Sequence, residues 1–123
     1  KNIEINKSDD LLREIAKDVV DAFKNKKYVF LAELEFWSLA NHDDEVRSRT
    51  KSLYVKLLSM FRKIIKNGID SGQYKKINVD VAAISVMTAL QGVIWFSIFE
   101  DSQLSAEDYL NDVIEFIIHG FKK

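Results

Sequence analysis

The 123-residue sequence contains no cysteine and no proline, and it has only four glycines. Without cysteine, the chain has no disulfide framework, no thiol nucleophile and no thiolate metal site. The scarcity of glycine and proline argues against turn-rich β architectures. The chain also lacks the basic start and apolar core of a signal peptide, so we expect a cytoplasmic protein.

The net charge of only −1 conceals an uneven distribution, because acidic side chains are scarce in the middle of the chain and basic ones are scarce in its last third. Residues 1–45 hold seven basic and eleven acidic side chains, residues 46–76 hold nine and one, and residues 77–123 hold two and seven. A basic segment can contact nucleic acid or a membrane surface. We favour a solvated helix face that lies between acidic helices.

Apolar residues recur at steps of three and four through most of the sequence, which predicts an all-α fold of about five helices. The predicted helices cover residues 8–25, 28–41, 43–72, 78–100 and 105–122, after a lead-in at residues 1–7. The length suits one domain, over residues 8–123.

The predicted helix over residues 43–72 has the clearest end signals and an apolar stripe along its length. Asp43 or Asp44 is expected to cap its first turn, and Gly72 is expected to end it in a left-handed conformation. Asn78 is expected to cap the following helix. A rod of this length needs partners along its whole apolar face.

Two segments are apolar on nearly every side, which predicts helices buried by neighbours all round. One is residues 28–40. The other is residues 81–99, nineteen residues without a charge, which reaches the lower limit for a membrane span. Its flanks are acidic and lack the Lys or Arg that anchors a span, so we expect a buried helix and no membrane.

The last two predicted helices carry more apolar surface than one chain needs to bury, which predicts a homodimer. Small residues on one side of the first allow close approach of another helix. The predicted dimer interface comprises Ala82, Ser85, Ala89, Gly92, Phe96, Leu110, Val113, Ile114, Ile117 and Phe121. Phe116 and Ile118 lie off the expected stripe of the last helix.

Catalytic and metal-binding patterns are scarce. Glu115 and His119 are four residues apart on a predicted helix and could supply half of a metal site, but the chain has no Glu-x-x-His motif of the kind found in bundle di-metal proteins. His42 precedes three acidic residues whose likelier role is capping. We therefore expect no enzyme, no cofactor and no metal.

A cluster of aromatic residues with one carboxylate predicts a small-molecule site among the helices. Such a wall suits an apolar or aromatic ligand, and a buried Glu33 would favour a cation. The predicted ligand-binding residues are Glu33, Phe36, Trp37, Tyr54, Leu57, Phe61, Gln91 and Trp95. The alternative interpretation is an aromatic core with Glu33 at its edge.

Three stretches in this order resemble a known family. They are FLAELEFWSLANHDDEVRSRT at residues 30–50, GIDSGQY at residues 68–74 and VDVAAISVMTALQG at residues 79–92. Together they resemble the C-terminal ligand-sensing and dimerisation domain of the tetracycline-repressor (TetR/AcrR) family of transcriptional regulators. The resemblance covers about residues 8–121.

This resemblance implies a homodimer formed by the last two helices in a four-helix bundle, and a small-molecule effector bound among the preceding helices. It also implies DNA binding through a helix-turn-helix head, which this chain does not contain. A stand-alone helical protein interaction module without a ligand pocket is the alternative. A thermal-shift screen for ligands separates the two hypotheses.

Overall fold

The computed structural model describes residues 7–96 and 106–122, and within them the chain is all-α, as predicted. The five helices are α2 (Lys7–Asn25), α3 (Lys27–Leu39), α4 (Asp44–Asp70), α5 (Val79–Phe96) and α6 (Ala106–Phe121). The expected helix ends at residues 100 and 105 lie outside the described residues. α2 begins at Lys7, one residue before the predicted start, and the rest of the predicted lead-in lies outside the described residues.

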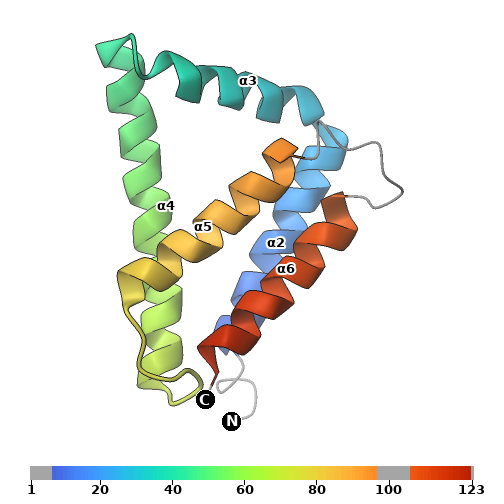
Figure 1. The fold of residues 1–123 in the computed structure, drawn as a ribbon, viewed down its shortest axis with the longest axis vertical. Helices are drawn as coiled ribbons and strands as arrows, with labels where there is room; N and C mark the ends of the chain where they lie inside the picture. Colours follow the sequence, from blue (N-terminus) through green and yellow to red (C-terminus); the bar gives the residue numbers. More distant parts are fainter. Residues whose placement is uncertain (1–6, 97–105, 123) are drawn as a thin grey trace.

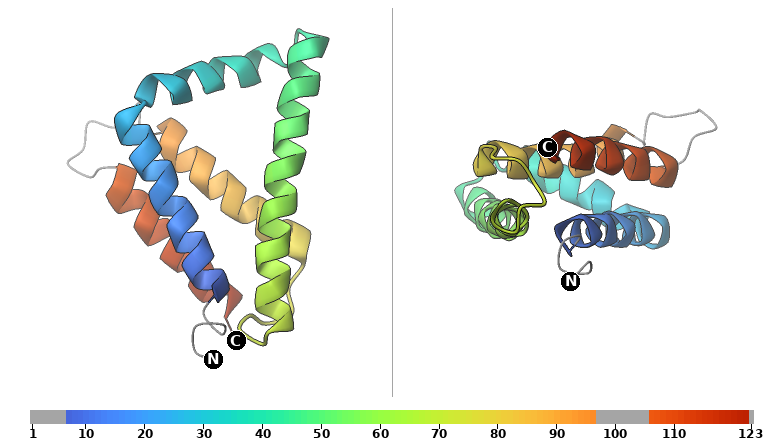
Figure 2. Two further views of the ribbon diagram at one scale, coloured as in Figure 1. Left: turned by 180° about the vertical axis from the view of Figure 1, so that it is seen from behind. Right: turned by 90° about the horizontal axis from the view of Figure 1, so that it is seen from below.

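The helices form two layers with a strut across one end. Figure 2 shows α5 and α6 together in one layer, with α2 and α4 in the other. In Figure 1, α3 spans the top of the molecule from the end of α2 to the start of α4. The start of α2, the end of α4 and the end of α6 meet at the opposite end. The end where α2 starts and α4 and α6 end is therefore closed by packing of three helices, and we call it the closed end. The opposite end is covered by α3 alone.

The core lies between the layers and is built from the apolar stripes of α2, α4, α5 and α6. The stripe predicted for α2 is confirmed, with Leu12, Ala16 and Val20 fully buried. The remaining core residues are Phe61, Ile64, Ile65, Tyr74, Ala82, Ala83, Val86, Leu90, Leu110, Ile114, Ile118 and Phe121. Burial of this apolar area is the main stabilising term of the fold.

Both ends of α4 have the predicted chemistry. The Asp43 carboxylate accepts hydrogen bonds from the backbone N–H groups of Glu45 and Val46, at 2.9 and 3.1 Å. Gly72, two residues after the helix, has a φ of 82°, which costs glycine no strain. At the start of α5, Asn78 Oδ1 accepts from Val81 N–H at 3.1 Å.

The expectation that α4 is covered along its whole apolar face is wrong. Its buried residues, Phe61, Ile64, Ile65 and Gly68, all lie in the second half, whereas Leu53 on the apolar stripe of the first half is exposed. The reason is geometric, since α5 crosses α4 and leaves its upper turns facing α3 alone (Figure 1).

The outer face of α4 is basic and solvent-exposed, as expected. Some of its charges have acidic partners: Arg62 Nε lies 2.8 Å from Asp80 on α5, and Lys66 pairs with Asp70 on α4 itself. Such exposed pairs contribute at most about 1 kcal/mol each. They place acidic groups beside the basic helix, which agrees with our interpretation of its charge.

Tyr74 joins the closed end of the molecule. Its hydroxyl donates a 2.6 Å hydrogen bond to Asp9 on α2, and its ring packs on Phe121 of α6 at a centroid distance of 5.4 Å. Both Tyr74 and Asp9 are buried. Burial, together with the Asp9 hydrogen bond, raises the pKa of Tyr74. Lys122 Nζ lies 2.7 Å from the other Asp9 oxygen and supplies the countercharge.

Two further contacts fix α2 to its neighbours. Ser8, expected as a helix start, instead lies inside the first turn, and its buried hydroxyl donates to the Ile64 carbonyl of α4 at 2.9 Å. Arg13 binds both carboxylate oxygens of Glu115 on α6, at 2.6 and 3.0 Å. The Arg13 guanidinium holds the pKa of Glu115 below its usual value.

The expected all-round burial of α3 is wrong. None of its described side chains is fully buried, and Tyr28, Val29, Phe36 and Leu39 are exposed. A helix that is apolar on every side is buried only if other helices pack on every side of it. α3 spans the gap between α2 and α4, where other helices pack on one side of it only. α3 contacts α2 through an edge-on pair of rings, Phe30 and Phe23, with 5.6 Å between ring centroids.

Complete burial of α5 was also a wrong expectation. Ala82, Ala83, Val86, Leu90 and Ile94 face the core, but other apolar side chains of the helix do not. Its exposed large residues are Val81, Ile84 and Phe96. The helix is thus apolar on two faces, and the chain itself covers one.

Candidate functional site

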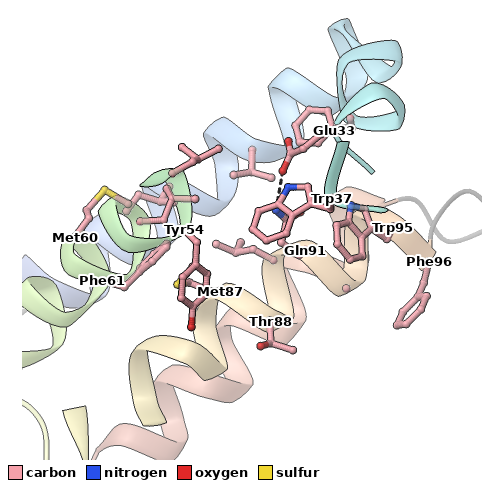
Figure 3. Close-up of a pocket in the computed structure, with 17 residues that line it drawn as sticks. Glu33, Trp37, Tyr54, Met60, Phe61, Met87, Thr88, Gln91, Trp95 and Phe96 are labelled. Atoms are coloured by element: carbon pink, nitrogen blue, oxygen red, sulfur yellow. Dashed lines mark hydrogen bonds between the residues drawn. The ribbon is translucent and has the colours of Figure 1, made fainter. Parts of the chain in front are cut away.

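A half-open cavity of about 530 Å³ lies below α3 and is lined by residues of α2, α3, α4 and α5 (Figure 3). This volume is in the range of sites for small organic ligands. The cavity lies at the end of the molecule where α3 spans the gap between the end of α2 and the start of α4 (Figure 1). Exposed residues at its edge, Leu53, Met60 and Phe96, make it accessible from solvent.

Aromatic rings from three helices line the cavity. Phe30 and Trp37 come from α3, Tyr54 and Phe61 from α4, and Trp95 and Phe96 from α5. Besides Glu33 and Gln91, the other lining residues are Ile15, Val19, Leu53, Leu57, Met60, Met87, Thr88, Leu90 and Gly92. Ring faces carry negative electrostatic potential, so this wall attracts apolar groups and organic cations alike.

Glu33 is the one charged residue among those that line the cavity. It is partly buried on α3, and its Oε1 accepts a 2.9 Å hydrogen bond from Gln91 Nε2 on α5. This bond fixes the carboxylate beside the Trp37 ring (Figure 3). No lysine or arginine belongs to the described lining, so the electrostatics of the cavity favour a positive group.

Trp95 is another lining residue with a polar group in its side chain. Its indole Nε1 is buried and has no hydrogen-bond partner among the described residues. A buried donor without a partner costs about 1–3 kcal/mol. The ring stands near the end of α5, one helical turn after Gln91 (Figure 3).

Seven of the eight residues predicted to bind ligand line this one cavity. They are Glu33, Trp37, Tyr54, Leu57, Phe61, Gln91 and Trp95. The exception is Phe36, which borders a second hollow of about 630 Å³ between α3 and the first half of α4. Ligand binding by these residues stays a prediction.

Sequence reasoning missed several lining residues, among them Met60 and Met87. Phe30 shares a helix face with Glu33 and Trp37, and this spacing places it in the predicted aromatic wall, although it is not among the predicted ligand-binding residues. Periodicity could not show that Ile15 and Val19 of α2 line the cavity, because they lie on the same apolar stripe as the residues of α2 that pack in the core.

The ten residues predicted for a dimer interface fall into two groups. Four of them, Ala82, Leu110, Ile114 and Phe121, are buried in this chain's own core and cannot contact a partner directly. Ser85 and Phe96 are exposed, and Ala89, Gly92, Val113 and Ile117 are partly buried.

The most regular apolar stripe of α6 faces the core of this chain. Leu110, Ile114, Ile118 and Phe121 recur at steps of four and three and pack on the core, so Ile118 is not off the stripe as expected. Phe116, set aside in the sequence analysis, is 81% exposed. The most regular stripe of α6 packs into the core of this chain, and Phe116, which lies outside that stripe, is exposed on the outer surface.

Glu115 and His119 do not form a metal site in the described structure. The Glu115 carboxylate binds Arg13, and His119 Nδ1 lies 2.7 Å from the Glu115 backbone carbonyl. Within the described ranges, no group of three or more His, Cys, Asp and Glu residues could hold a metal ion.

Among the described helices, α5 is long and apolar enough to cross a membrane by length and composition. The core helix of a soluble protein meets the same criterion. Five of its side chains pack against the rest of this chain, which gives its apolar character another cause.

Comparison with known proteins identifies one family. The family model described as "BetI-type transcriptional repressor, C-terminal" matches residues 8–120, nearly the whole chain. Comparison with curated proteins gave no match, and comparison with solved structures gave none.

Proposed function

Because the chain belongs to the family of BetI-type C-terminal domains of TetR-family transcriptional repressors, we propose that it senses a small effector and dimerises. The proposed effector has an apolar or aromatic body and a positive charge. The observation that carries the proposal is the cavity of about 530 Å³, whose lining has six aromatic residues and a single carboxylate.

The charge of the effector is assigned from the cavity lining. The Glu33 carboxylate is held by Gln91 at 2.9 Å and borders the aromatic wall. An organic cation placed there is attracted by the Glu33 charge and also contacts ring faces. Each contact between the cation and a ring face contributes about 0.5–2 kcal/mol. An organic anion would meet the Glu33 charge without a countercharge in the lining.

A matched pair of ligands tests this assignment. Phenethyltrimethylammonium and (3,3-dimethylbutyl)benzene have the same shape and differ by a nitrogen cation in place of a carbon. Both tryptophans of the chain line the cavity, so intrinsic fluorescence reports binding. We expect the wild type to prefer the cation roughly 3- to 30-fold.

Two glutamate variants separate local charge from net charge. Glu33→Gln should remove the preference for the cation, since the amide keeps the shape without the charge. Glu35→Gln, at an exposed position on the same helix, should keep it. An equal preference in wild type and Glu33→Gln would exclude the role assigned to Glu33.

Effector binding can alter the DNA affinity of the repressor only if it changes the conformation of this domain or the way two copies pair. The family description places this domain C-terminal in a repressor, and we propose that the DNA-binding head precedes α2. α4 would connect the two sites: Tyr54 and Phe61 line the cavity, and the Ile64 carbonyl holds Ser8 at the start of α2. Such a regulator acts in the cytoplasm.

The proposed dimer uses the outer surface of α5 and α6. Val81, Ile84 and Phe116 are large apolar side chains exposed on these two adjacent helices. The proposed interface uses the two helices that we predicted. It does not include the four predicted residues that are buried in the core of this chain. An association of two α5–α6 pairs forms a four-helix bundle.

The alternative function is a helical interaction module. The exposed side chains of Tyr28, Phe36 and Leu39 on α3 favour it, because such a surface also suits a partner helix. A protein of this kind would show no thermal stabilisation by any small organic cation.

A further inference from the structure

The second hollow, of about 630 Å³, adjoins the cavity below α3 and lies between α3 and the first half of α4. Three residues line both spaces: Glu33, Trp37 and Leu53. Leu53 is 46% exposed, so solvent covers part of the border between the two spaces. A ligand in the cavity can therefore extend over Leu53 into the second hollow.

The Glu33 carboxylate belongs to this border, which determines where a bound cation lies. Its Oε1 accepts a 2.9 Å hydrogen bond from Gln91, a residue that lines the cavity and not the second hollow. A tetrahedral ammonium nitrogen directs its substituents to different sides. A cation held at Glu33 can thus place one substituent in the cavity and another in the second hollow.

The polar side chains that line only the second hollow already have partners within the protein. Arg49 pairs with Glu45 at 3.0 Å on the exposed edge, and the Thr50 hydroxyl donates to the Val46 carbonyl at 3.0 Å. The surface left for a ligand is apolar and comes from Val29, Ala32, Phe36 and Val46. Because the first three are exposed in the empty domain, a ligand that covers them removes apolar surface from water.

We propose that the effector carries a second apolar arm on its positive centre, and that this arm lies in the second hollow against Phe36. The inference rests on the proposed ligand-binding function, because it uses the same cavity and the same carboxylate. It gives a role to Phe36, which lines the second hollow and not the cavity. The effector class is thus an ammonium ion with an aromatic substituent on one side and an alkyl or aryl substituent on the other.

A matched pair of cations tests the second arm. Phenethyltrimethylammonium and phenethyl(dimethyl)hexylammonium share the ring and the charged nitrogen, and they differ in the length of one alkyl group. Titration calorimetry, at concentrations where neither cation forms micelles, gives their dissociation constants for the whole chain. A fully buried methylene strengthens binding about fourfold, and the exposed walls of the hollow bury each one only in part. We expect the wild type to bind the longer cation about 10 to 30 times more tightly.

Phe36→Ala removes the largest apolar side chain that lines the second hollow alone. This variant should reduce the preference for the longer cation at least about threefold, with the affinity for the shorter cation close to that of the wild type. Phe36 is 53% exposed and lies outside the core, and thermal unfolding without ligand confirms that the variant is folded.

Leu39→Ala is the matched control. Leu39 lies on the same helix and is 50% exposed, but it lines neither the cavity nor the second hollow. This variant should keep the full preference for the longer cation.

The outcomes separate this inference from the function beneath it. Binding of neither cation to the wild type would overturn the proposed function, and the inference with it. Equal binding of both cations to the wild type, or weaker binding of the longer one, would overturn the inference alone. So would a preference that Phe36→Ala retains in full, or one that Leu39→Ala reduces equally, since the arm would then lie elsewhere.

Discussion

Gly68 illustrates how a single residue determines the closed end of the molecule. A Cβ atom at this position would overlap the Tyr74 ring, which lies directly against the α4 backbone. The Tyr74 N–H also donates to the Gly68 carbonyl at 2.9 Å. Position 68 in the last turns of α4 therefore needs a residue without a side chain. Only then can the Tyr74 ring pack there and its hydroxyl reach Asp9.

We predict that Gly68→Ala destabilises the domain by about 1–3 kcal/mol, because the Tyr74 ring must move out of a packed site. Urea unfolding followed by circular dichroism measures the change. Gly120→Ala is the control: no atom lies within 4 Å of the added Cβ, and alanine favours a helix. Equal stability of the Gly68 variant and the wild type would contradict the packing.

The raised pKa of Tyr74 predicts a loss of stability at alkaline pH. In the unfolded chain this phenol ionises near its usual pKa of 10.0, whereas burial keeps it protonated in the fold. Its contribution is complete below that pH and declines as the pH rises above it. Unfolding free energies measured between pH 8 and 11 should fall more steeply in the wild type than in Tyr74→Phe.

At neutral pH the same variant should be less stable by about 1–3 kcal/mol, since buried Asp9 loses a donor. The fit of Tyr74 to Asp9 could not be predicted from the sequence, because the partners lie 65 positions apart. The caps at Asp43 and Asn78 and the left-handed Gly72 could be predicted, because their partners are adjacent in the chain.

At the scale of elements, periodicity predicted the five helices but not their surroundings. α3 and α5 are apolar on more sides than the chain covers, and both were expected to be buried. A helical pattern shows which faces avoid water, and it does not show what covers them. On α6, one stripe faces the core, and Phe116 lies outside it.

The weak packing of α3 predicts low local stability. With no described side chain fully buried, its opening exposes little additional surface, so its amide hydrogens should exchange faster than those of α2 and α6. Hydrogen exchange with mass spectrometry measures this. Phenethyltrimethylammonium should slow exchange in α3, because Phe30, Glu33 and Trp37 would contact it. Exchange in α3 as slow as in α2 would contradict the prediction.

For the whole molecule, the cavity could be predicted in outline because side chains of one helix face converge on a shared interior. Glu33 and Trp37 share such a face of α3, as do Gln91 and Trp95 on α5. What the sequence could not provide is the span of α3, which keeps the cavity open. That span equals the separation between the end of α2 and the start of α4, a property of the assembled helices (Figure 1).

The proposed dimer gives the last prediction. If Phe116 packs against a second copy, the side chain becomes a central apolar anchor, and Phe116→Asp should weaken association at least about 30-fold. Dimerisation also makes the melting temperature of the wild type rise with protein concentration. Sedimentation at micromolar concentration and thermal melts over a concentration series measure the two effects.

Tyr28→Asp is the matched control, because this ring is exposed to a similar degree but lies on α3, away from the proposed interface. It should leave association unchanged, and the concentration dependence of melting should remain. The Phe116 variant should instead melt at one temperature throughout. A monomeric wild type would show that the apolar surface of α5 and α6 serves something other than a second copy, and equal loss in both variants would place the contact on α3 as well.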